Sequence, residues 1–151
     1  MELNYKYAKT SQRIIAAFVD GIIFSLLFYA IIKLVLWGFG KNLDELLDFG
    51  QPNLFKVGYK QISTLCFIFY GTIFESSKYQ GTPGKGVAEI KVVDKNNKRL
   101  SFKDAFMRNA FKPISTLLFF IGHFWMIFDK KKQALHDKIG NSYVVEEQMT
   151  Y

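Results

Sequence analysis

The feature that most constrains this chain is an apolar block from Ile14 to Trp37 that carries an acid, Asp20, in its interior. As a helix with a rise of about 1.5 Å per residue, the block is long enough to cross the roughly 30 Å hydrocarbon layer of a bilayer. Lys33 lies near its far end, where its side chain can reach the membrane surface. The block therefore predicts a transmembrane helix with a carboxylic acid inside its span.

Two further apolar blocks follow the first. Of the 151 residues, 50% are hydrophobic, and they gather in blocks instead of recurring at the periods of soluble strands and helices. The block from about Val57 to Glu75 predicts a second span. The block from Ile114 to Phe128 is short for a span and predicts either a third short apolar helix or a re-entrant hairpin. The expected fold is an α-helical membrane protein with a single domain over residues 1–151.

The basic residues of the chain flank the apolar blocks. The formal net charge is +7, which in a soluble protein would suggest nucleic-acid binding. Next to apolar blocks, lysines and arginines instead favour contact with anionic lipid headgroups, so no nucleic-acid partner is expected. Residues 78–112 are rich in cations, as is the segment before Ile14. The positive-inside rule then predicts a multi-pass protein of the cell (cytoplasmic) membrane with a cytoplasmic N-terminus.

The polar region between the second and third blocks predicts a small β-sheet. Residues 87–93 have the composition of a strand, a turn follows, and residues 99–102 suit a short return strand. Residues 142–145 suit a third strand, and we expect all three to pair in the cytoplasm because an isolated hairpin is only marginally stable in water. The C-terminus is then cytoplasmic as well, which favours a re-entrant path for residues 102–128 over the alternative, a full third span.

Between the expected return strand and the third apolar block, the sequence predicts a helix. Ser101, with Asp104 three residues later, has the signature of a helix N-terminus, so the helix should begin at Phe102. It should end or kink at Pro113, since proline lacks the N–H that a helix interior uses.

Four short motifs occur in a characteristic order along nearly the whole chain. They are Arg13 with Ala16 and Asp20; Thr82-Pro83-Gly84-Lys85 before Ile90-Lys91-Val92-Val93-Asp94; Arg108 after Ser101-Phe102; and Leu135-His136-Asp137-Lys138-Ile139 before Tyr143-Val144-Val145. Each motif alone is weak, but the four together resemble the RDD family of membrane proteins. One departure is Asn141-Ser142, where many relatives have a small residue and threonine, and this change is conservative.

The resemblance implies particular site residues. The family is named for one arginine and two aspartates. Arg13 and Asp20 match the first two, and Asp137 is the favoured match for the third, with Asp129 as the other candidate. Members of the family are usually described as possible transport components, and some have been associated with sodium/proton antiport. The resemblance therefore implies a transport-related function without naming a substrate.

Asp20 is the residue whose chemistry matters most. Burying a carboxylate at this depth costs on the order of 3 kcal/mol, so we expect either a proton or cation site or a structural ion pair. Arg13 lies about 10 Å away along the helix, which is long for a direct pair. Arg108 is therefore the expected cationic partner of Asp20, with Lys112 and Lys85 as alternatives.

Other polar residues can join this site. Glu75 either completes an acidic cation site with Asp20 or, as we favour, is a solvated residue at a helix end. His136 beside Asp137 suggests a catalytic pair, but no serine or cysteine nucleophile is evident, so we expect a turn anchor. His123, in the third apolar block, is either a polar contact between helices or part of a proton relay. The expected charge network comprises Arg13, Asp20, Glu75, Arg108 and Asp137, with Lys85, His123, His136 and Asp129 as secondary members.

The remaining patterns exclude several functions. Residues 81–86 superficially resemble a phosphate-binding loop, but the glycine spacing is wrong and a glycine follows Lys85. No metal or other cofactor is expected, nor an enzyme, since no acid, base and nucleophile converge. Two spans and a hairpin cannot enclose a pathway, so cation/proton exchange through Asp20 would need a homo-oligomer or a membrane protein partner. The alternative is a non-catalytic scaffold or assembly factor that binds a partner protein or anionic lipid.

Overall fold

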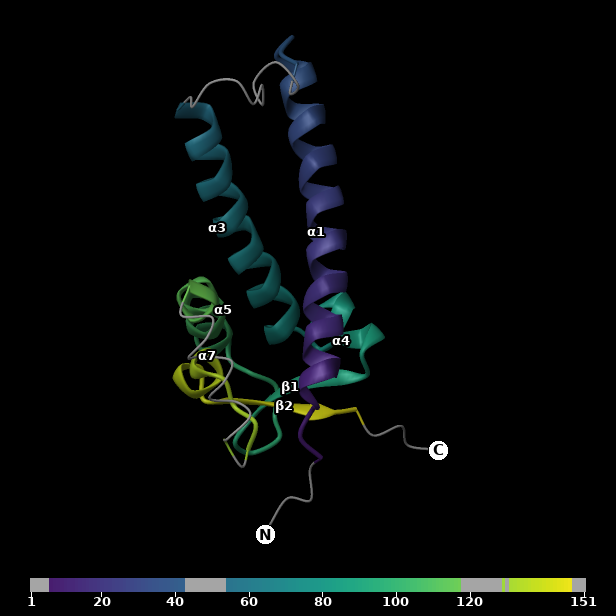
Figure 1. Cartoon of the computed structure of the whole chain (residues 1–151), viewed down its shortest axis with the longest axis vertical. Coiled ribbons are helices and arrows are strands. Elements are labelled where there is room, and N and C mark those ends of the chain that lie inside the picture. Colours follow the sequence, from purple (N-terminus) through teal and green to yellow (C-terminus); the bar gives the residue numbers. More distant parts are fainter. Residues whose placement is uncertain (1–5, 43–53, 118–128, 130, 148–151) are drawn as a thin grey trace. The chain divides into compact units, whose positions relative to one another are not determined.

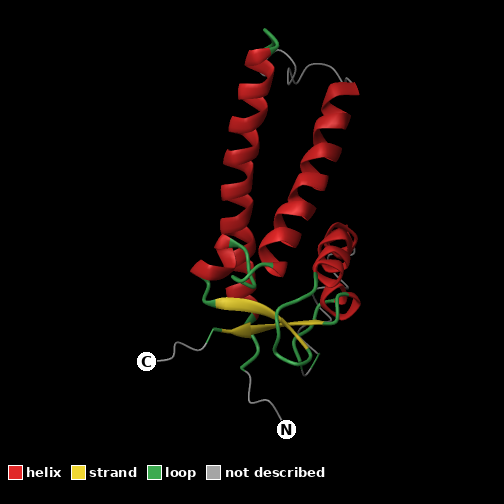
Figure 2. Ribbon diagram, turned by 180° about the vertical axis from the view of Figure 1, so that it is seen from behind, coloured by secondary structure: helices red, strands yellow, loops and turns green. Residues whose placement is uncertain are grey.

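The structure, a computed structural model, describes residues 6–42, 54–117, 129 and 131–147 (Figure 1). Its elements in chain order are α1 (Thr10–Gly38), α3 (Leu54–Ser76), α4 (Pro83–Val87), β1 (Ile90–Asp94), α5 (Phe102–Leu117), α7 (Leu135–Ile139) and β2 (Ser142–Glu146). Figure 2 separates the helices from the two strands. The chain divides into two compact units, residues 1–20 with 68–151 and residues 21–67.

Helix α1 covers the first apolar block and has the character of a membrane span. Among the described residues it is the one helix long and apolar enough to cross a membrane. Its large apolar side chains are turned outward: Phe18 is 69% exposed, Leu26 66% and Leu34 67%. Such a surface is unfavourable in water and is what a lipid-facing helix presents. Helix α3 covers the second apolar block, but a second span remains a prediction.

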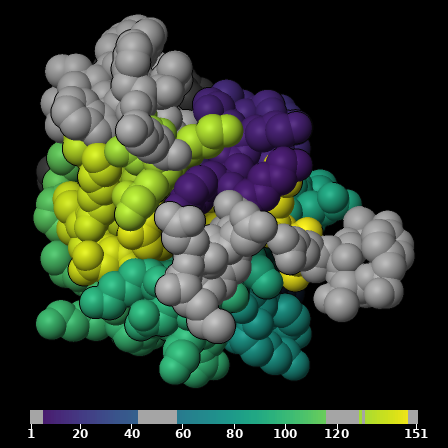
Figure 3. Space-filling model, turned by 90° about the horizontal axis from the view of Figure 1, so that it is seen from below, coloured from purple at the N-terminus to yellow at the C-terminus, as the bar shows by residue number. Residues whose placement is uncertain are grey.

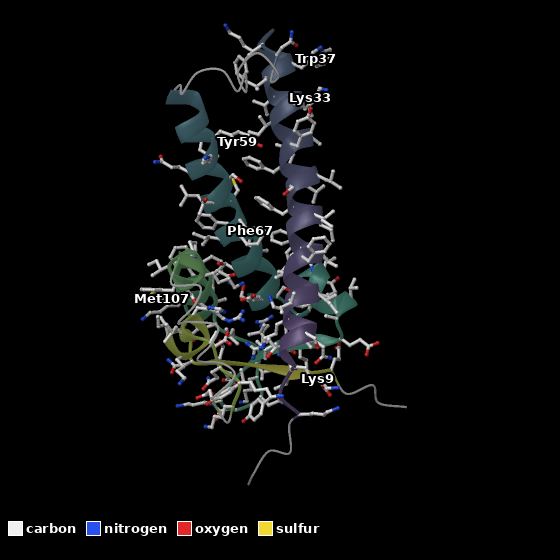
Figure 4. The ribbon with its side chains drawn as sticks, viewed as in Figure 1. Lys9, Lys33, Trp37, Tyr59, Phe67 and Met107 are labelled. Carbon is white, nitrogen blue, oxygen red and sulfur yellow. The ribbon has the colours of Figure 1, made fainter. Side chains whose placement is uncertain are left out.

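The unit of residues 21–67 is held by aromatic contacts between α1 and α3. The rings of Phe24 and Phe67 meet edge to face with centroids 5.0 Å apart. The rings of Phe28 and Tyr59 lie 5.3 Å apart, and Figure 4 labels Tyr59 and Phe67 along α3. Such pairs contribute about 0.5–1.5 kcal/mol each beyond their burial, so they fix the register of the two helices.

The sheet consists of β1 and β2 in antiparallel pairing, from Ile90 opposite Glu146 to Asp94 opposite Ser142. The expected pairing of residues 142–145 with the first predicted strand is thus confirmed. The N-terminal segment adds to the other edge of β2, where Tyr7 bridges Val145. Seen from below, the purple N-terminal residues lie beside the yellow residues of β2 (Figure 3).

Two predictions about the strands are wrong: one expected strand is absent and another begins later than expected. Residues 99–102 form no return strand, because the backbone N–H of Val92 on the far edge of β1 already donates to the carbonyl oxygen of Gln80 and α5 begins at Phe102. The first strand begins at Ile90 instead of residue 87, because Pro83 starts a short helix that runs to Val87. Proline at the first helical position has the φ angle that a helix needs and lacks only an N–H that would be unpaired there.

Helix α5 begins as predicted but ends later. The Ser101 hydroxyl oxygen accepts the backbone N–H of Asp104 at 3.1 Å, which caps the helix start. Of the two alternatives predicted at Pro113, an end of the helix is wrong, because the helix continues through this proline to Leu117. Residues 118–128 of the third apolar block, including His123, lie outside the described residues.

Candidate functional site

A first buried acid, Asp137, lies in the short helix α7 and binds two arginines from distant parts of the chain. Arg13 Nη1 donates to Asp137 Oδ2 at 2.6 Å, and Arg108 Nε donates to Oδ1 at 2.9 Å. The N–H of Ala134 also donates to Oδ2 at 3.1 Å, so the carboxylate caps its own helix. Burial would raise the pKa of Asp137, but the charges of Arg108 and Arg13 outweigh burial and hold this pKa well below its usual range.

A second buried acid, Glu75, lies at the end of α3 and collects three cations. Lys85 Nζ lies 2.6 Å and Lys112 Nζ 3.0 Å from its Oε1, and Arg108 Nη1 lies 2.5 Å from its Oε2. The Asn109 amide donates to the same Oε2 at 2.8 Å. The expectation of a solvated helix-end residue is therefore wrong: Glu75 is fully buried, and these partners offset the cost of burying its charge.

Arg108 connects the two acids. Its side chain is 2% exposed and pairs with Glu75 and with Asp137. Burial would lower the pKa of Arg108, but the two carboxylates raise it above its ordinary value. We use "charge network" for the six residues Arg13, Glu75, Lys85, Arg108, Lys112 and Asp137, in which four cations surround two acids.

Lys112, one of the four cations of the charge network, has a lowered pKa. Burial lowers the pKa of Lys112 to about 7, although Glu75 acts in the opposite direction. His136 lies beside the network with its Nε2 3.4 Å from Asp137 Oδ1, and burial lowers the pKa of His136 to about 3. At neutral pH this imidazole is therefore uncharged and adds no further positive charge.

A third buried acid, Asp20 on α1, is held quite differently. It is 4% exposed, and its Oδ1 accepts the backbone N–H of Gly84 at 2.8 Å and the Tyr70 hydroxyl at 3.3 Å. The Thr82 hydroxyl donates to Oδ2. We use "Asp20 site" for these four residues, whose contacts with the acid are all made by neutral donors.

The expected pairing of Asp20 with Arg108 is wrong. Within the described ranges, no lysine, arginine or histidine nitrogen lies within 4.0 Å of the Asp20 carboxylate. Lys85 contacts Asp20 only through Thr82: its Nζ donates to the Thr82 hydroxyl at 3.4 Å and also binds Glu75. Arg108 is unavailable to Asp20 because both remaining acids already engage it.

Glycines allow the elements to approach closely at both sites. A Cβ added at Gly84 would lie 2.3 Å from the carbonyl oxygen of Ala16 and 2.7 Å from Cγ of Asp20. A Cβ added at Gly140 would lie 2.6 Å from Cβ of Arg108. Side chains cannot occupy such positions, so these glycines set the distance of α4 from α1 and of α7 from α5.

The structure can now be compared with the site residues predicted from the sequence. Most of the expected network does come together, with Lys85 moving from a secondary to a central member. Asp129 lies apart, with its Oδ1 3.1 Å from Lys138 Nζ and its Oδ2 accepting the N–H of Gln133 at 3.1 Å. Tyr70 and Asn109 were missed, because a tyrosine or asparagine in a helix gives no sequence signal of its partner. Thr82 and Gly84 belong to a recognised motif, but their contact with Asp20 needs the fold.

In the described part of the chain, the His, Cys, Asp and Glu side chains form no group of three or more that could hold a metal ion. The Asp20 site instead offers a carboxylate beside two hydroxyl oxygens. Such an oxygen set can bind a proton or a hard monovalent cation, whereas the acids of the charge network are already neutralised by fixed cations.

Comparison with known proteins identifies relatives over the same region. The profile described as RDD family matches residues 7–141, which include the charge network and the Asp20 site. The uncharacterized protein YxaI of Bacillus subtilis (strain 168) is 30% identical over 142 residues, which cover 88% of this chain and 93% of that protein. No solved structure matches.

Proposed function

This chain belongs to the RDD family of membrane proteins, and we propose that it is a transport-related protein that exchanges a monovalent cation for protons, with Asp20 as the titrating acid. The observation that supports this most is the environment of Asp20. It is a buried acid on the apolar helix α1, and its partners are neutral donors.

An exchanger needs an acid whose negative charge can be balanced alternately by a cation and by a proton. Glu75 and Asp137 are poor choices, because lysines and arginines already balance them. Among the described residues, Asp20 has no such fixed counter-ion within 4.0 Å, and the hydroxyls of Thr82 and Tyr70 can serve it in two ways. They donate to the bare carboxylate, and they can turn their lone pairs towards a bound cation.

Exchange also requires a pathway that one chain does not supply. We propose that the working form is a homo-oligomer or a complex with another membrane protein, surrounded by lipids with anionic headgroups. The apolar surface of α1, with side chains such as Leu26 and Leu34 turned outward, is available for lipid and for such a neighbour.

We further propose that the protein is multi-pass in the cell membrane with both ends of the chain cytoplasmic. Tyr7 pairs with Val145, and two segments in one sheet must lie on the same side of a bilayer. The basic N-terminal region supports a cytoplasmic location for that side. Labelling of a cysteine introduced at Gln148 in intact cells tests this: reaction with an impermeant reagent from outside would contradict it.

The exchange proposal is tested in proteoliposomes that carry a pH-sensitive dye and an imposed proton gradient. Addition of sodium or potassium should collapse the gradient with the wild-type chain, and Asp20→Asn should slow the collapse at least tenfold. Glu147→Gln, which removes an exposed acid of the same unit, is the matched control and should leave the rate unchanged. An unchanged rate in Asp20→Asn, or no exchange by the wild type, would refute the proposal.

The charge network favours a second candidate, a non-catalytic scaffold or assembly factor. Its side chains come from α1, α3, α4, α5 and α7 and tie these elements together, as a rigid binding module requires. Neither candidate is an enzyme, since His136 lies beside an acid that two arginines neutralise, an arrangement that fixes a turn. A wild-type protein that folds and binds vesicles or a partner, but never exchanges ions, would favour the scaffold.

A further inference from the structure

Helix α5 buries polar side chains and exposes apolar ones, the reverse of a helix on the surface of a soluble protein. One stripe, at the helical spacing i, i+3, i+4 and i+7, is turned inward and consists of Ala105, Arg108, Asn109 and Lys112. Arg108 and Asn109 are each 2% exposed, and both bind Glu75. Three of the four side chains that this stripe turns inward are therefore polar.

The opposite side of α5 is apolar and exposed. Phe102 is 55% exposed, Met107 37% and Ile114 53%. Met107 projects from α5 away from the rest of its compact unit (Figure 4). Phe111, which is half-buried, completes this surface, and we use "outer face of α5" for these four residues. The ring of Phe106 packs instead against Phe69 of α3, with ring centroids 5.8 Å apart.

Such a distribution is unfavourable in water. Apolar area left in water costs about 25 cal/mol per Å² relative to burial, and soluble amphipathic helices accordingly bury the apolar stripe and expose the charged one. The reverse distribution is stable where the medium outside the helix is less polar than the interior of the protein. A bilayer provides that medium.

Three features of the same unit indicate that lipid covers the outer face. The start of α1 exposes Ile14, Ile15 and Phe18 at 63%, 52% and 69%, so the unit already presents an apolar surface of membrane type. In the sequence, α5 leads directly into the apolar residues 114–128. The exposed charges of α5 are confined to its beginning, at Lys103, where a headgroup can bind them.

We propose that the outer face of α5 contacts lipid acyl chains, so that α5 is embedded in the cytoplasmic interface of the membrane with its charged stripe turned into the protein. The charge network then lies at the boundary of the bilayer instead of in a cytoplasmic domain. This inference concerns membrane placement and does not depend on whether Asp20 exchanges ions.

The test uses nitroxide labels on single cysteines in the full chain, reconstituted into vesicles of phosphatidylethanolamine and phosphatidylglycerol. Cys66 is the sole cysteine in the sequence, so Cys66→Ala provides the background. Labels are placed on the outer face by Met107→Cys and Ile114→Cys. Leu26→Cys on α1 is the lipid-exposed control, and Asn96→Cys in the exposed turn after β1 is the water-exposed control.

Collision rates of each label with oxygen and with a water-soluble nickel chelate distinguish the surroundings. Oxygen concentrates in acyl chains, so labels at residues 107 and 114 should favour oxygen several-fold over nickel, as at residue 26. A preference for nickel like that at residue 96 would place the face in water and overturn the proposal. Low rates with both reagents would show that protein covers the face, either a second copy or residues 118–128, and would overturn it equally.

A third position guards against misfolding of one of these variants. Phe102→Cys probes the first turn of the outer face, and monodisperse gel filtration of each labelled variant verifies its fold. Ala105→Cys, on the buried stripe, should show low rates with both reagents if it folds. Equal oxygen preference at residues 105 and 107 would contradict a helix with two distinct faces.

Discussion

The charge network and the Asp20 site solve the same problem, the burial of acids, by opposite means. Glu75 and Asp137 are surrounded by cations, whereas Asp20 is surrounded by neutral donors. Fixed cations stabilise the ionised form of an acid, and the low pKa of Asp137 is the result. Neutral donors add no charge, so the net charge of the Asp20 site depends on whether a proton or a cation also binds there.

The two sites are also joined. The ammonium group of Lys85 binds Glu75 at 2.6 Å and the Thr82 hydroxyl at 3.4 Å, and that hydroxyl donates to Asp20. A change of occupancy at Asp20 that turns the Thr82 hydroxyl therefore alters the contacts of Lys85 in the network. The difference between the sites suggests a division of roles, in which the network keeps the fold and the Asp20 site changes state.

The largest expected effect comes from removing a charge of the network. Glu75→Gln leaves Lys85, Arg108 and Lys112 without their shared counter-ion, and breaking a buried pair in this way costs about 3–5 kcal/mol. The melting temperature in detergent should fall accordingly. It is measured as the temperature at which the monodisperse gel-filtration peak is lost.

Asp20→Asn is the matched comparison for that variant, because it too replaces a buried carboxylate by an amide. Its donors are neutral, so the free energy of unfolding should fall by only about 1 kcal/mol. Equal losses in the two variants would mean that the two kinds of site do not differ in their structural role.

The sequence predicts one side of this comparison better than the other. The apolar run around Asp20 identifies a buried acid in a membrane helix, because insertion depends on composition over a continuous segment. Ser101 likewise marks the start of α5, since a cap acts within one turn. Local signals of this kind can be interpreted without knowledge of the fold.

Partners from distant parts of the chain leave no such signal. Arg13 binds Asp137, which follows it by more than a hundred residues, and only tertiary packing brings them together. Glu75 has the sequence context of a solvated helix end, yet the approach of α5 buries it. The third place in the sheet is similar: residues 6–8 lack the alternation of a strand and take this place because the fold brings them to the edge of β2.

An effect smaller than that of Glu75→Gln is expected from a substitution at Gly84, which brings α4 against α1. In Gly84→Ala the new Cβ would lie 2.3 Å from the carbonyl oxygen of Ala16 and 2.7 Å from Cγ of Asp20. Overpacking of this kind costs roughly 1–3 kcal/mol, and it should displace the N–H that binds Asp20, slowing exchange as well.

Gly86→Ala is the control for that substitution, because it lies in the same short helix and its Cβ would meet nothing within 4 Å. Its melting temperature should stay equal to that of the wild type or rise slightly, since alanine favours helix. If both alanine variants behave alike, close contact between α4 and α1 is not what positions Asp20.

The charge network should also make stability depend on pH through Lys112. Its folded-state pKa of about 7 lies below the ordinary value of 10.5 because the amine is buried. Between these values the unfolded chain binds more protons, so the free energy of unfolding should rise with pH across this window, at a slope of at most about 1.4 kcal/mol per pH unit. Lys112→Met should flatten the rise, and a slope that persists in this variant would assign it to other groups.

The smallest stability effect is expected at Thr82, where the two sites meet. Thr82→Val keeps the shape but removes the hydroxyl that donates to Asp20 and accepts from Lys85, at a cost of about 1 kcal/mol or less, while Thr82→Ser should match the wild type. If this hydroxyl turns towards a bound cation, Thr82→Val should raise the KM for sodium or potassium several-fold and lower kcat less. An unchanged KM with reduced stability would make Thr82 a structural donor, and the Asp20 site would then be as fixed as the charge network beside it.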